Sequence, residues 1–119
     1  MKIKLIIKGR PMSKDNEKLF GSHGRPYTSA KYKAYAYNVA CQAKQQMLEN
    51  GWKMYEVPVI VTMTFFFKND VRLDLFNAPK SIADALNGVL WGDDRQICVG
   101  HLHISYSTNE RVEIEVEDY

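Results

Sequence analysis

The segment LDLFNAPKSIADALNGVLWGDD (residues 73–94) links two strand-like runs and carries one aspartate near its start and two at its end. Its middle predicts a short helix over residues 77–88, because Asn77 can cap the first turn, Pro79 is tolerated there and Gly88 can end the helix. A short helix that follows one strand and precedes another ordinarily packs across the two. The segment therefore predicts a short helix between two strands, which pack side by side if the second strand returns along the first.

Strands are indicated on both sides of this segment. The preceding run VPVIVTMTFFFK (residues 57–68) is apolar on both alternating faces, as in a central strand. The runs QICVGHLHISYS (96–107) and ERVEIEVED (110–118) predict two further strands. At the amino terminus, KIKLIIK (2–8) alternates apolar with mostly basic residues and predicts a half-buried strand.

The rest of the chain predicts one loop and one long helix. Residues 9–28 hold three glycines and two prolines, and they predict a loop whose length suits either a binding role or an ordinary mobile segment. A helical pattern follows Ser29, which can cap it, and ends at Asn50-Gly51. The predicted order is β-α-β-α-β-β in a single domain over residues 1–119.

Composition narrows the class of protein. No apolar run approaches the ~20 residues needed to cross a bilayer, and the amino terminus lacks the pattern of an export signal, so we expect a soluble, cytoplasmic protein. The two cysteines, Cys41 and Cys98, form no metal-binding or disulfide pattern. They are predicted to be buried thiols in a reducing compartment.

Charge is unevenly distributed along the chain. Residues 1–54 hold 11 Lys/Arg against 3 Asp/Glu, whereas residues 55–119 hold 5 against 11. A basic part can attract a polyanion while an acidic part holds cations, which suits a metal-dependent enzyme that acts on nucleic acid. The alternative is that the two parts do not form separate faces and that the lysines are simply solvated.

Three aspartates bracket the short predicted helix: Asp74 before it, and Asp93 and Asp94 after it. A helix of about 12 residues is ~18 Å long, so the acids can meet only if the next strand returns alongside the segment that holds Asp74. Such a cluster would suit Mg²⁺ and phosphodiester hydrolysis. An ordinary Asp-Asp turn after Gly92 is the alternative.

Lys80 lies in the first predicted turn of that helix, where a cation opposes the helix dipole. The position suits an anion such as a scissile phosphate, and a surface pair with Asp84, four residues on, is the alternative. His101 and His103 share one face of a predicted strand, but no third ligand stands near them in the sequence. A transition-metal site is therefore not favoured.

These residues resemble the RusA family of Holliday-junction resolvases, small Mg²⁺-dependent endonucleases common in phages and prophages. P-M-S-K-D-N at 11–16 is similar to the family's P-x-S-K-x-N loop, and 74–80 read D-L-F-N-A-P-K where the family has D-x-D-N-x-x-K. The run D-A-L-N-G-V-L-W-G-D-D-R-Q-I at 84–97 follows the family pattern. The resemblance covers nearly the whole chain, and it implies an α+β fold, a mixed sheet with helices packed on it, and a homodimer.

The resemblance also implies site residues. Asp74, Lys80 and Asp94 would be catalytic, and Asp74, Asp93 and Asp94 would hold the metal, Mg²⁺ or, in its place, Mn²⁺. Phe76 departs from the family, because it stands where the family has its second aspartate and so removes one ligand; Asp93 is the expected substitute. The residues expected to contact DNA are basic or polar: Arg10, Lys14, Asn16, Lys18, Arg25, Lys31 and Arg72.

The function so implied is a Mg²⁺-dependent, structure-selective endodeoxyribonuclease that resolves four-way DNA junctions by paired symmetric nicks, in DNA recombination and repair. Branched DNA and a second copy of the chain are the expected partners, without a membrane or a small-molecule cofactor. Two alternatives stay open. One is a catalytically weak or inactive junction-binding protein of the same fold, and the other is a phage or prophage structural or interaction protein whose carboxylates only make turns.

Overall fold

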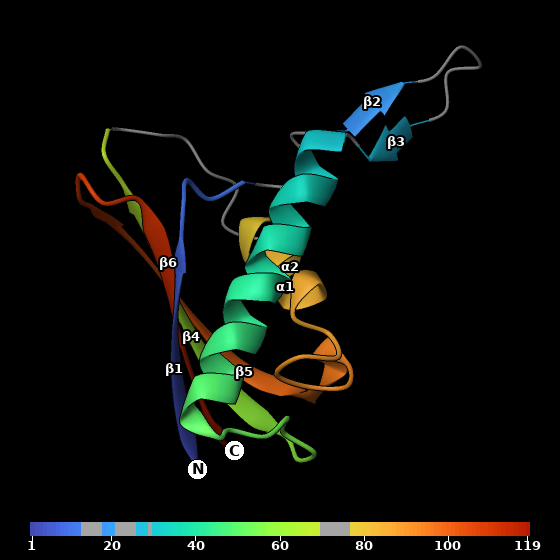
Figure 1. The fold of residues 1–119 in the computed structure, drawn as a ribbon, viewed down its shortest axis with the longest axis vertical. Coiled ribbons are helices and arrows are strands. Elements are labelled where there is room, and N and C mark those ends of the chain that lie inside the picture. Colours follow the sequence, from blue (N-terminus) through green and yellow to red (C-terminus); the bar gives the residue numbers. More distant parts are fainter. Residues whose placement is uncertain (13–17, 21–25, 29, 70–76) are drawn as a thin grey trace.

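The computed structural model describes residues 1–12, 18–20, 26–28, 30–69 and 77–119. The elements, in chain order, are β1 (Lys2–Lys8), β2 (Lys18–Phe20), β3 (Pro26–Thr28), α1 (Ala30–Asn50), β4 (Val59–Phe67), α2 (Asn77–Ala85), the 3₁₀ helix η2 (Asp94–Gln96), β5 (Ile97–Tyr106) and β6 (Arg111–Asp118) (Figure 1). Apart from β2, β3 and η2, this order is the predicted β-α-β-α-β-β. The α+β class is therefore confirmed.

Four of the strands form one mixed sheet in the order β1-β6-β4-β5. β6 pairs antiparallel with both β1 and β4, while β5 runs parallel to β4. The parallel pair needs a crossover connection, and α2 supplies it, as the segment at 73–94 predicted. β4 lies between β6 and β5, which confirms that the most apolar run of the chain is an inner strand.

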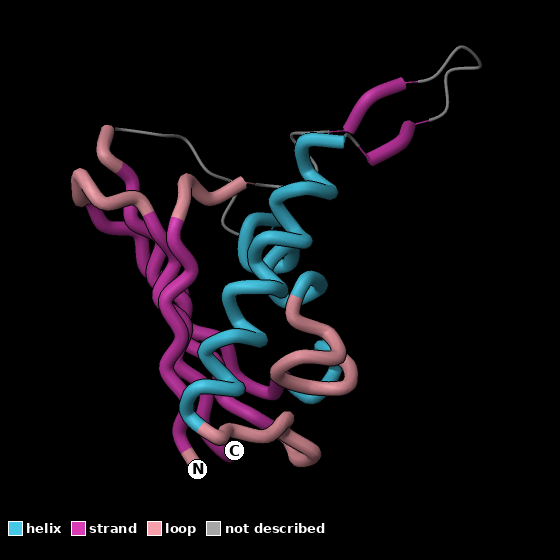
Figure 2. The backbone as a smooth tube through the Cα atoms, viewed as in Figure 1, coloured by secondary structure: helices cyan, strands magenta, loops and turns pink. Residues whose placement is uncertain are grey.

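The core lies between the sheet and the two helices, which cover the same face of the sheet in Figures 1 and 2. Alternate residues of β1, β4 and β6 point into it, because successive side chains of a strand face opposite sides. From α1, a stripe at helical spacing is buried: Tyr32, Val39, Ala43 and Met47. Trp91, which is fully buried, donates its indole N–H to Asn87 Oδ1 at 3.0 Å and so ties the end of the α2 region to the core.

The free edge of β1 is closed by two glutamine side chains of α1. Gln42 accepts a hydrogen bond from the Lys8 N–H (2.8 Å) and donates one to the Lys8 carbonyl (2.9 Å). Gln46 makes the same pair of bonds to Ile6, at 2.9 and 2.7 Å. The two side chains thus take the place of a further strand on the outer backbone groups of β1.

Two sequence predictions need correction. Part of the predicted loop at 9–28 is an antiparallel strand pair, β2 with β3, whose three-residue strands are too short to show a periodic pattern in the sequence. Cys41 and Cys98 are exposed rather than buried. Cys41 lies off the buried stripe of α1, and Cys98 lies at the start of β5, an edge strand that the helices leave uncovered. None of the described helices is long and apolar enough to span a membrane.

Candidate functional site

The turn before β5 is fixed by one side chain. Gln96 accepts hydrogen bonds from the backbone N–H groups of Gly92 (2.9 Å) and Asp93 (3.3 Å). Its amide nitrogen donates to the carbonyls of Tyr55 (3.0 Å) and Val57 (3.1 Å), just before β4. These four bonds hold the Asp-Asp turn against the segment that leads into the central strand.

Asp93 acts within this turn as a helix cap. Its carboxylate accepts the Arg95 backbone N–H at 2.9 Å and lies 3.4 Å from the Arg95 guanidinium. The backbone hydrogen bond, followed by the bonds from the Arg95 side chain and the Asp94 carboxyl, lowers the pKa of Asp93. Asp93 therefore matches the turn interpretation of the Asp-Asp pair, at least for its first member.

Asp94 faces a different environment. Its carboxyl group is in hydrogen-bonding contact with the carboxyl groups of Asp84 and Asp93, and desolvation by burial, followed by these two neighbours, raises the pKa of Asp94. Asp84 comes from the last turn of α2, so the helix and the turn bring together carboxylates ten residues apart in the chain. Like charges in contact leave a place where a cation would be stabilised.

Asp84 was considered in the sequence only as a surface partner of Lys80. The structure gives it another neighbour, since it contacts Asp94, and the described ion pairs do not include one between Lys80 and Asp84. The signal that could have revealed this was the spacing itself. Residues four apart share one face of a helix, so the face that carries Lys80 also carries Asp84 toward the turn that follows the helix.

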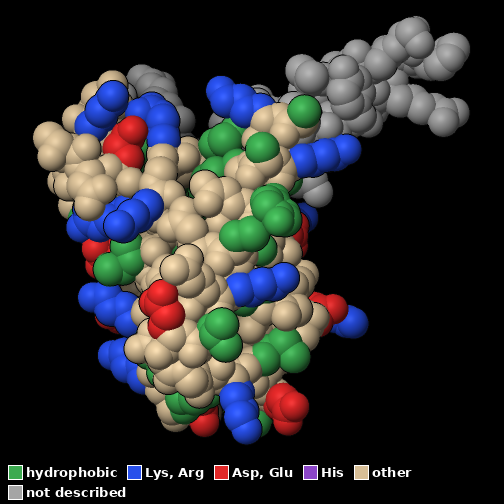
Figure 3. Space-filling model, in the orientation of Figure 1, with side chains coloured by type: hydrophobic (Ala, Val, Ile, Leu, Met, Phe, Trp, Pro, Cys, Tyr) green, Lys and Arg blue, Asp and Glu red, His purple; other side chains and the backbone are tan. Residues whose placement is uncertain are grey.

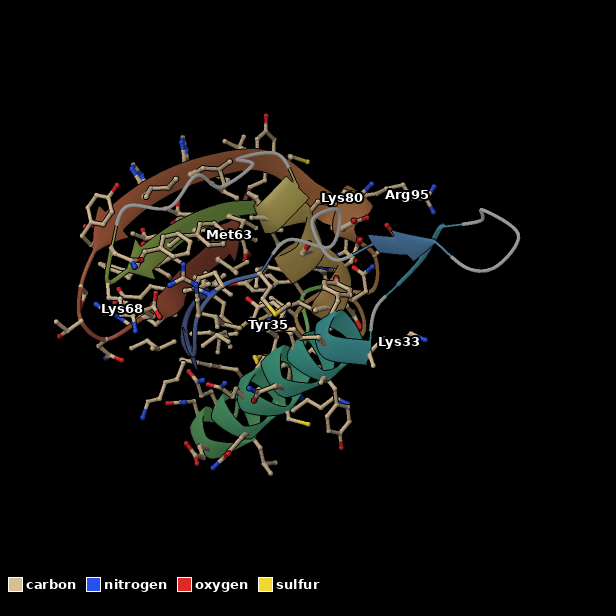
Figure 4. The ribbon with its side chains drawn as sticks, turned by 90° about the horizontal axis from the view of Figure 1, so that it is seen from above. Lys33, Tyr35, Met63, Lys68, Lys80 and Arg95 are labelled. Carbon is tan, nitrogen blue, oxygen red and sulfur yellow. The ribbon has the colours of Figure 1, made fainter. Side chains whose placement is uncertain are left out.

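Lys80 lies in the first turn of α2, and its side chain is exposed. Figure 4 shows Lys80 and Arg95 at the same end of the molecule, beside the end of the long strand β5. Lys80 also borders an apolar cavity of about 160 Å³ between α2 and the β4–β5 pair, lined by Val61, Met63, Pro79, Ala83, Ile97, Gly100 and Leu102. Lys80 and Asp84 thus share one face of α2, and Asp94 of η2 contacts Asp84, an arrangement that suits a phosphodiester together with a divalent ion.

Within residues 30–69 and 77–119 and the shorter described stretches, no group of three or more His, Cys, Asp or Glu side chains is arranged to hold a metal ion. Asp84 and Asp94 are oxygen donors in mutual contact, and Mg²⁺ needs only one or two carboxylates beside water and phosphate oxygens. The described residues therefore fit Mg²⁺ in part; Asp74 and Phe76 lie outside them.

His101 and His103 lie on β5, in register with Thr62 and Thr64 of β4, and both are exposed. No third ligand joins them among the residues that the structure describes.

Of the residues expected to contact DNA, the structure describes the side chains of Arg10 and Lys31. Arg10 binds Glu110 at 2.7 Å and lies over the ring of Phe67, 5.7 Å from its centroid, so it is anchored at the end of the sheet. Lys31 is exposed in the first turn of α1. The remainder lie outside the described side chains: Lys14, Asn16, Lys18, Arg25 and Arg72.

The charge difference between the two parts of the sequence is not repeated as two separate faces. β1 pairs with β6, so the lysines of β1 stand beside the glutamates of β6, and Lys4 lies 3.7 Å from Glu113 and 4.0 Å from Glu115. Figure 3 shows Lys and Arg side chains interspersed with Asp and Glu on the visible face. The pairing of β1 with β6 therefore brings basic and acidic residues together that lie in opposite parts of the sequence.

The family model described as "Endodeoxyribonuclease RusA" matches residues 8–117, nearly the whole chain. A search among curated proteins found no match, so the family model alone carries the assignment.

Proposed function

The chain belongs to the RusA family of endodeoxyribonucleases, which resolve DNA junctions, and we propose that it is a Mg²⁺-dependent nuclease that cuts four-way junctions by paired symmetric nicks. The observation that carries this proposal is the contact between the carboxyl groups of Asp84 and Asp94, since Asp84 shares a face of α2 with Lys80. RusA resolvases generally use a divalent metal, and paired carboxylates are the ligands that such an ion prefers.

In the proposed mechanism, Asp94 and Asp74 would hold the cation, and Asp84 would offer a further carboxylate oxygen. When bound, Mg²⁺ supplies Lewis-acid chemistry at the scissile phosphate. Lys80, exposed one helical turn before Asp84, binds the phosphate and offsets the negative charge that grows as the bond is cut. Asp93 holds the turn in shape through Arg95, so that the carboxyl group of Asp94 stays directed at Asp84.

Phe76 leaves the proposed metal site with one carboxylate ligand fewer than the family pattern has. The family pattern has an aspartate there, and an aromatic ring cannot bind Mg²⁺. Asp93 was the expected substitute, but its carboxylate already accepts a backbone N–H and pairs with Arg95. We therefore propose Asp84 in its place.

Branched DNA is the proposed substrate, and the nuclease is proposed to act as a homodimer. A dimer with two-fold symmetry suits a four-way junction, because each copy can cut one of two opposed strands. The proposed DNA contacts are the basic and polar side chains named from the sequence, of which Arg10 and Lys31 are described and exposed.

The test is cleavage of a labelled synthetic four-way junction in Mg²⁺ and in Mn²⁺, with the nicks mapped on all four strands. The unaltered protein is compared with its Phe76→Asp variant. Paired symmetric nicks by the unaltered protein are expected, with faster cutting by the variant. If neither protein cuts or binds the junction better than duplex DNA at equal salt, the proposal fails.

A second candidate function is junction binding with weak or no cleavage. The observation that favours it is Phe76, which stands where the family pattern has its second aspartate. It predicts that only Phe76→Asp cuts, while both proteins bind the junction equally well.

A further inference from the structure

Two different elements supply the carboxyl groups of the candidate site. Asp84 lies in the last turn of α2 and Asp94 is the first residue of η2, so the chain between them does not by itself fix their distance. Their carboxyl groups are nevertheless in contact. A misplacement of about 1 Å in a site can cost a large part of the rate, so both elements need a common support.

Tyr55, in the segment before β4, provides this support. Its backbone N–H donates to the Leu90 carbonyl at 2.8 Å, and its carbonyl accepts a hydrogen bond from the side-chain amide of Gln96 at 3.0 Å. Tyr55 is buried, and its hydroxyl group lies 2.8 Å from the Met1 carbonyl and 3.0 Å from that of Val116. One residue anchored to the sheet thus contacts both the segment that follows α2 and the side chain that holds the Asp-Asp turn.

On the α2 side, the bond to Leu90 leads to Asp84 through Trp91. The indole N–H of Trp91 donates to Asn87 Oδ1 at 3.0 Å and lies 3.4 Å from the carbonyl of Ala83, the residue before Asp84. Ala83, Leu90 and Trp91 are all buried in the core. Asp84 is therefore held by apolar packing as well as by hydrogen bonds.

On the side of the Asp-Asp turn, the connection runs through the side chain of Gln96. Its Oε1 accepts the backbone N–H groups of Gly92 and Asp93 at 2.9 and 3.3 Å, and its Nε2 donates to the carbonyls of Tyr55 and Val57 at 3.0 and 3.1 Å. A primary amide can accept and donate at the same time, which neither a carboxylate nor an apolar side chain can do. Gln96 and Asp93 are only half-buried, so this turn depends on hydrogen bonds where α2 depends on packing.

We propose that Gln96 is a positioning residue of the nuclease, whose amide holds Asp94 at the distance from Asp84 at which the two carboxyl groups can share one cation. The inference rests on the proposed function and names the residue that sets the geometry of its metal site. Gln96 touches neither the cation nor the DNA and acts through Asp94. Residues that orient a metal ligand typically change metal affinity by about 10- to 100-fold.

Mn²⁺ binding without DNA, followed by electron paramagnetic resonance, measures the effect on the site. Gln96→Met keeps a side chain of similar length and removes all four bonds, so it should weaken Mn²⁺ binding by about 10-fold. The matched control is Gln46→Met, because Gln46 also binds backbone groups through its amide, but does so at Ile6 in β1. Gln46→Met should bind Mn²⁺ as the unaltered protein does, and equal weakening by both variants would overturn the inference.

A double-mutant cycle distinguishes positioning from a general loss of structure. In an Asp94→Asn background no carboxylate remains for Gln96 to position, so Gln96→Met should weaken Mn²⁺ binding no further. The same fold-loss with and without Asp94 would show that Gln96 does not act through Asp94.

Thermal melts without metal test the positioning independently of any cation. Asp84→Asn removes one of two like-charged groups in contact and should raise the melting temperature by about 2 °C at pH 7. In a Gln96→Met background this gain should disappear, because Asp94 is no longer held against Asp84. In a Gln46→Met background it should persist. A gain that survives in Gln96→Met contradicts the inference.

The two measurements separate the inference from the proposed function. Failure of the unaltered protein to bind Mn²⁺ would remove the metal-dependent nuclease, while the metal-free melts would still decide whether Gln96 positions Asp94. Mn²⁺ binding that Gln96→Met leaves unchanged, in a protein shown to be folded by circular dichroism, would overturn the inference and leave the nuclease standing. If Gln96→Met does not fold, Gln96→Asn replaces it with Gln46→Asn as its control, because an amide one methylene shorter cannot bridge the turn and Tyr55.

Discussion

At one edge of the sheet, Gln42 and Gln46 of α1 hydrogen-bond to the backbone of β1, whereas at the other edge β5 has no second neighbour among the described strands. We call β1, β6 and α1 the closed side, and β5, α2 and η2 the open side. The closed side satisfies its own backbone groups. Among the described residues, the open side has a strand edge without a second strand and an apolar cavity beneath α2.

The closed and open sides also differ in how their charged side chains are paired. On the closed side, Glu113 lies 2.7 Å from Arg111 and 3.7 Å from Lys4, so opposite charges meet. On the open side, the like-charged groups Asp84 and Asp94 are in contact. Opposite pairs help the fold modestly, while like charges in contact oppose folding until a cation joins them. The difference teaches that charges on the closed side are paired within the fold, whereas the crowded carboxylates of the open side are where we propose that a cation binds.

The largest expected effect on cleavage comes from replacing Asp94 on the open side. Asp94→Asn should reduce junction cleavage by about 1000-fold, because the cation that stabilises the transition state loses a ligand. Junction binding should be unchanged or tighter, since a negative charge is removed. The control is Asp118→Asn on the closed side, where Asp118 lies 3.6 Å from the amino-terminal nitrogen. Equal loss of cleavage in both variants would contradict the difference between the sides.

Lys80→Ala should reduce cleavage by about 100-fold, because a cation beside the phosphate is removed while the metal ligands remain. Lys4→Ala, which removes a lysine paired with Glu113 on the closed side, should cut nearly as well as the unaltered protein. Single-turnover rates on a labelled junction measure both. A Lys80→Ala rate equal to that of Lys4→Ala would exclude a role for Lys80 in the chemistry.

Removing the glutamine hydrogen bonds that cover the edge of β1 should lower stability and leave cleavage unchanged. Gln46→Ala removes both bonds to Ile6 and should lower the free energy of unfolding by about 1–2 kcal/mol. Gln45→Ala, next to it, removes only a bond to Glu49 on the helix surface and should be nearly neutral. Urea unfolding of the two variants decides the matter, and equal midpoints would show that the edge bonds add nothing.

The smallest expected effect comes from relieving the crowded carboxylates. The raised pKa of Asp94 means that its protonated form favours folding, so this contribution is present at acidic pH and is lost as the pH rises through the raised pKa. Asp84→Asn should therefore raise the melting temperature by about 2 °C at pH 7 without metal, and by less at acidic pH. Thermal melts at the two pH values check this, and an unchanged or lower value at pH 7 would contradict it.

Much of the fold could be predicted from the sequence, because alternation in 2–8 and 110–118 and the apolar run at 57–68 report directly on which faces are buried. The hairpin strands β2 and β3 were missed because three residues show no period. Cys41 and Cys98 were placed wrongly because residue type alone does not decide burial: Cys41 lies off the buried stripe of α1, and Cys98 lies in the edge strand β5.

The candidate site was only partly predictable. The Asp-Asp turn and Lys80 stand out in the sequence, but the contact of Asp84 with Asp94 depends on where α2 ends relative to β5. The role of Asp93 could not be predicted either, because only the structure shows that its carboxylate accepts the Arg95 backbone N–H and so differs from Asp94. Two adjacent aspartates look alike in a sequence and differ only through the backbone that holds them.

Binding of Mn²⁺, followed by electron paramagnetic resonance, tests most directly whether the open side holds the cation. The unaltered protein, Asp84→Asn, Asp94→Asn and the control Asp118→Asn are titrated without DNA. We expect weaker binding by both open-side variants, most of all by Asp94→Asn, and unchanged binding by Asp118→Asn. Equal Mn²⁺ binding by all four proteins would contradict the assignment of the metal to the Asp84–Asp94 contact.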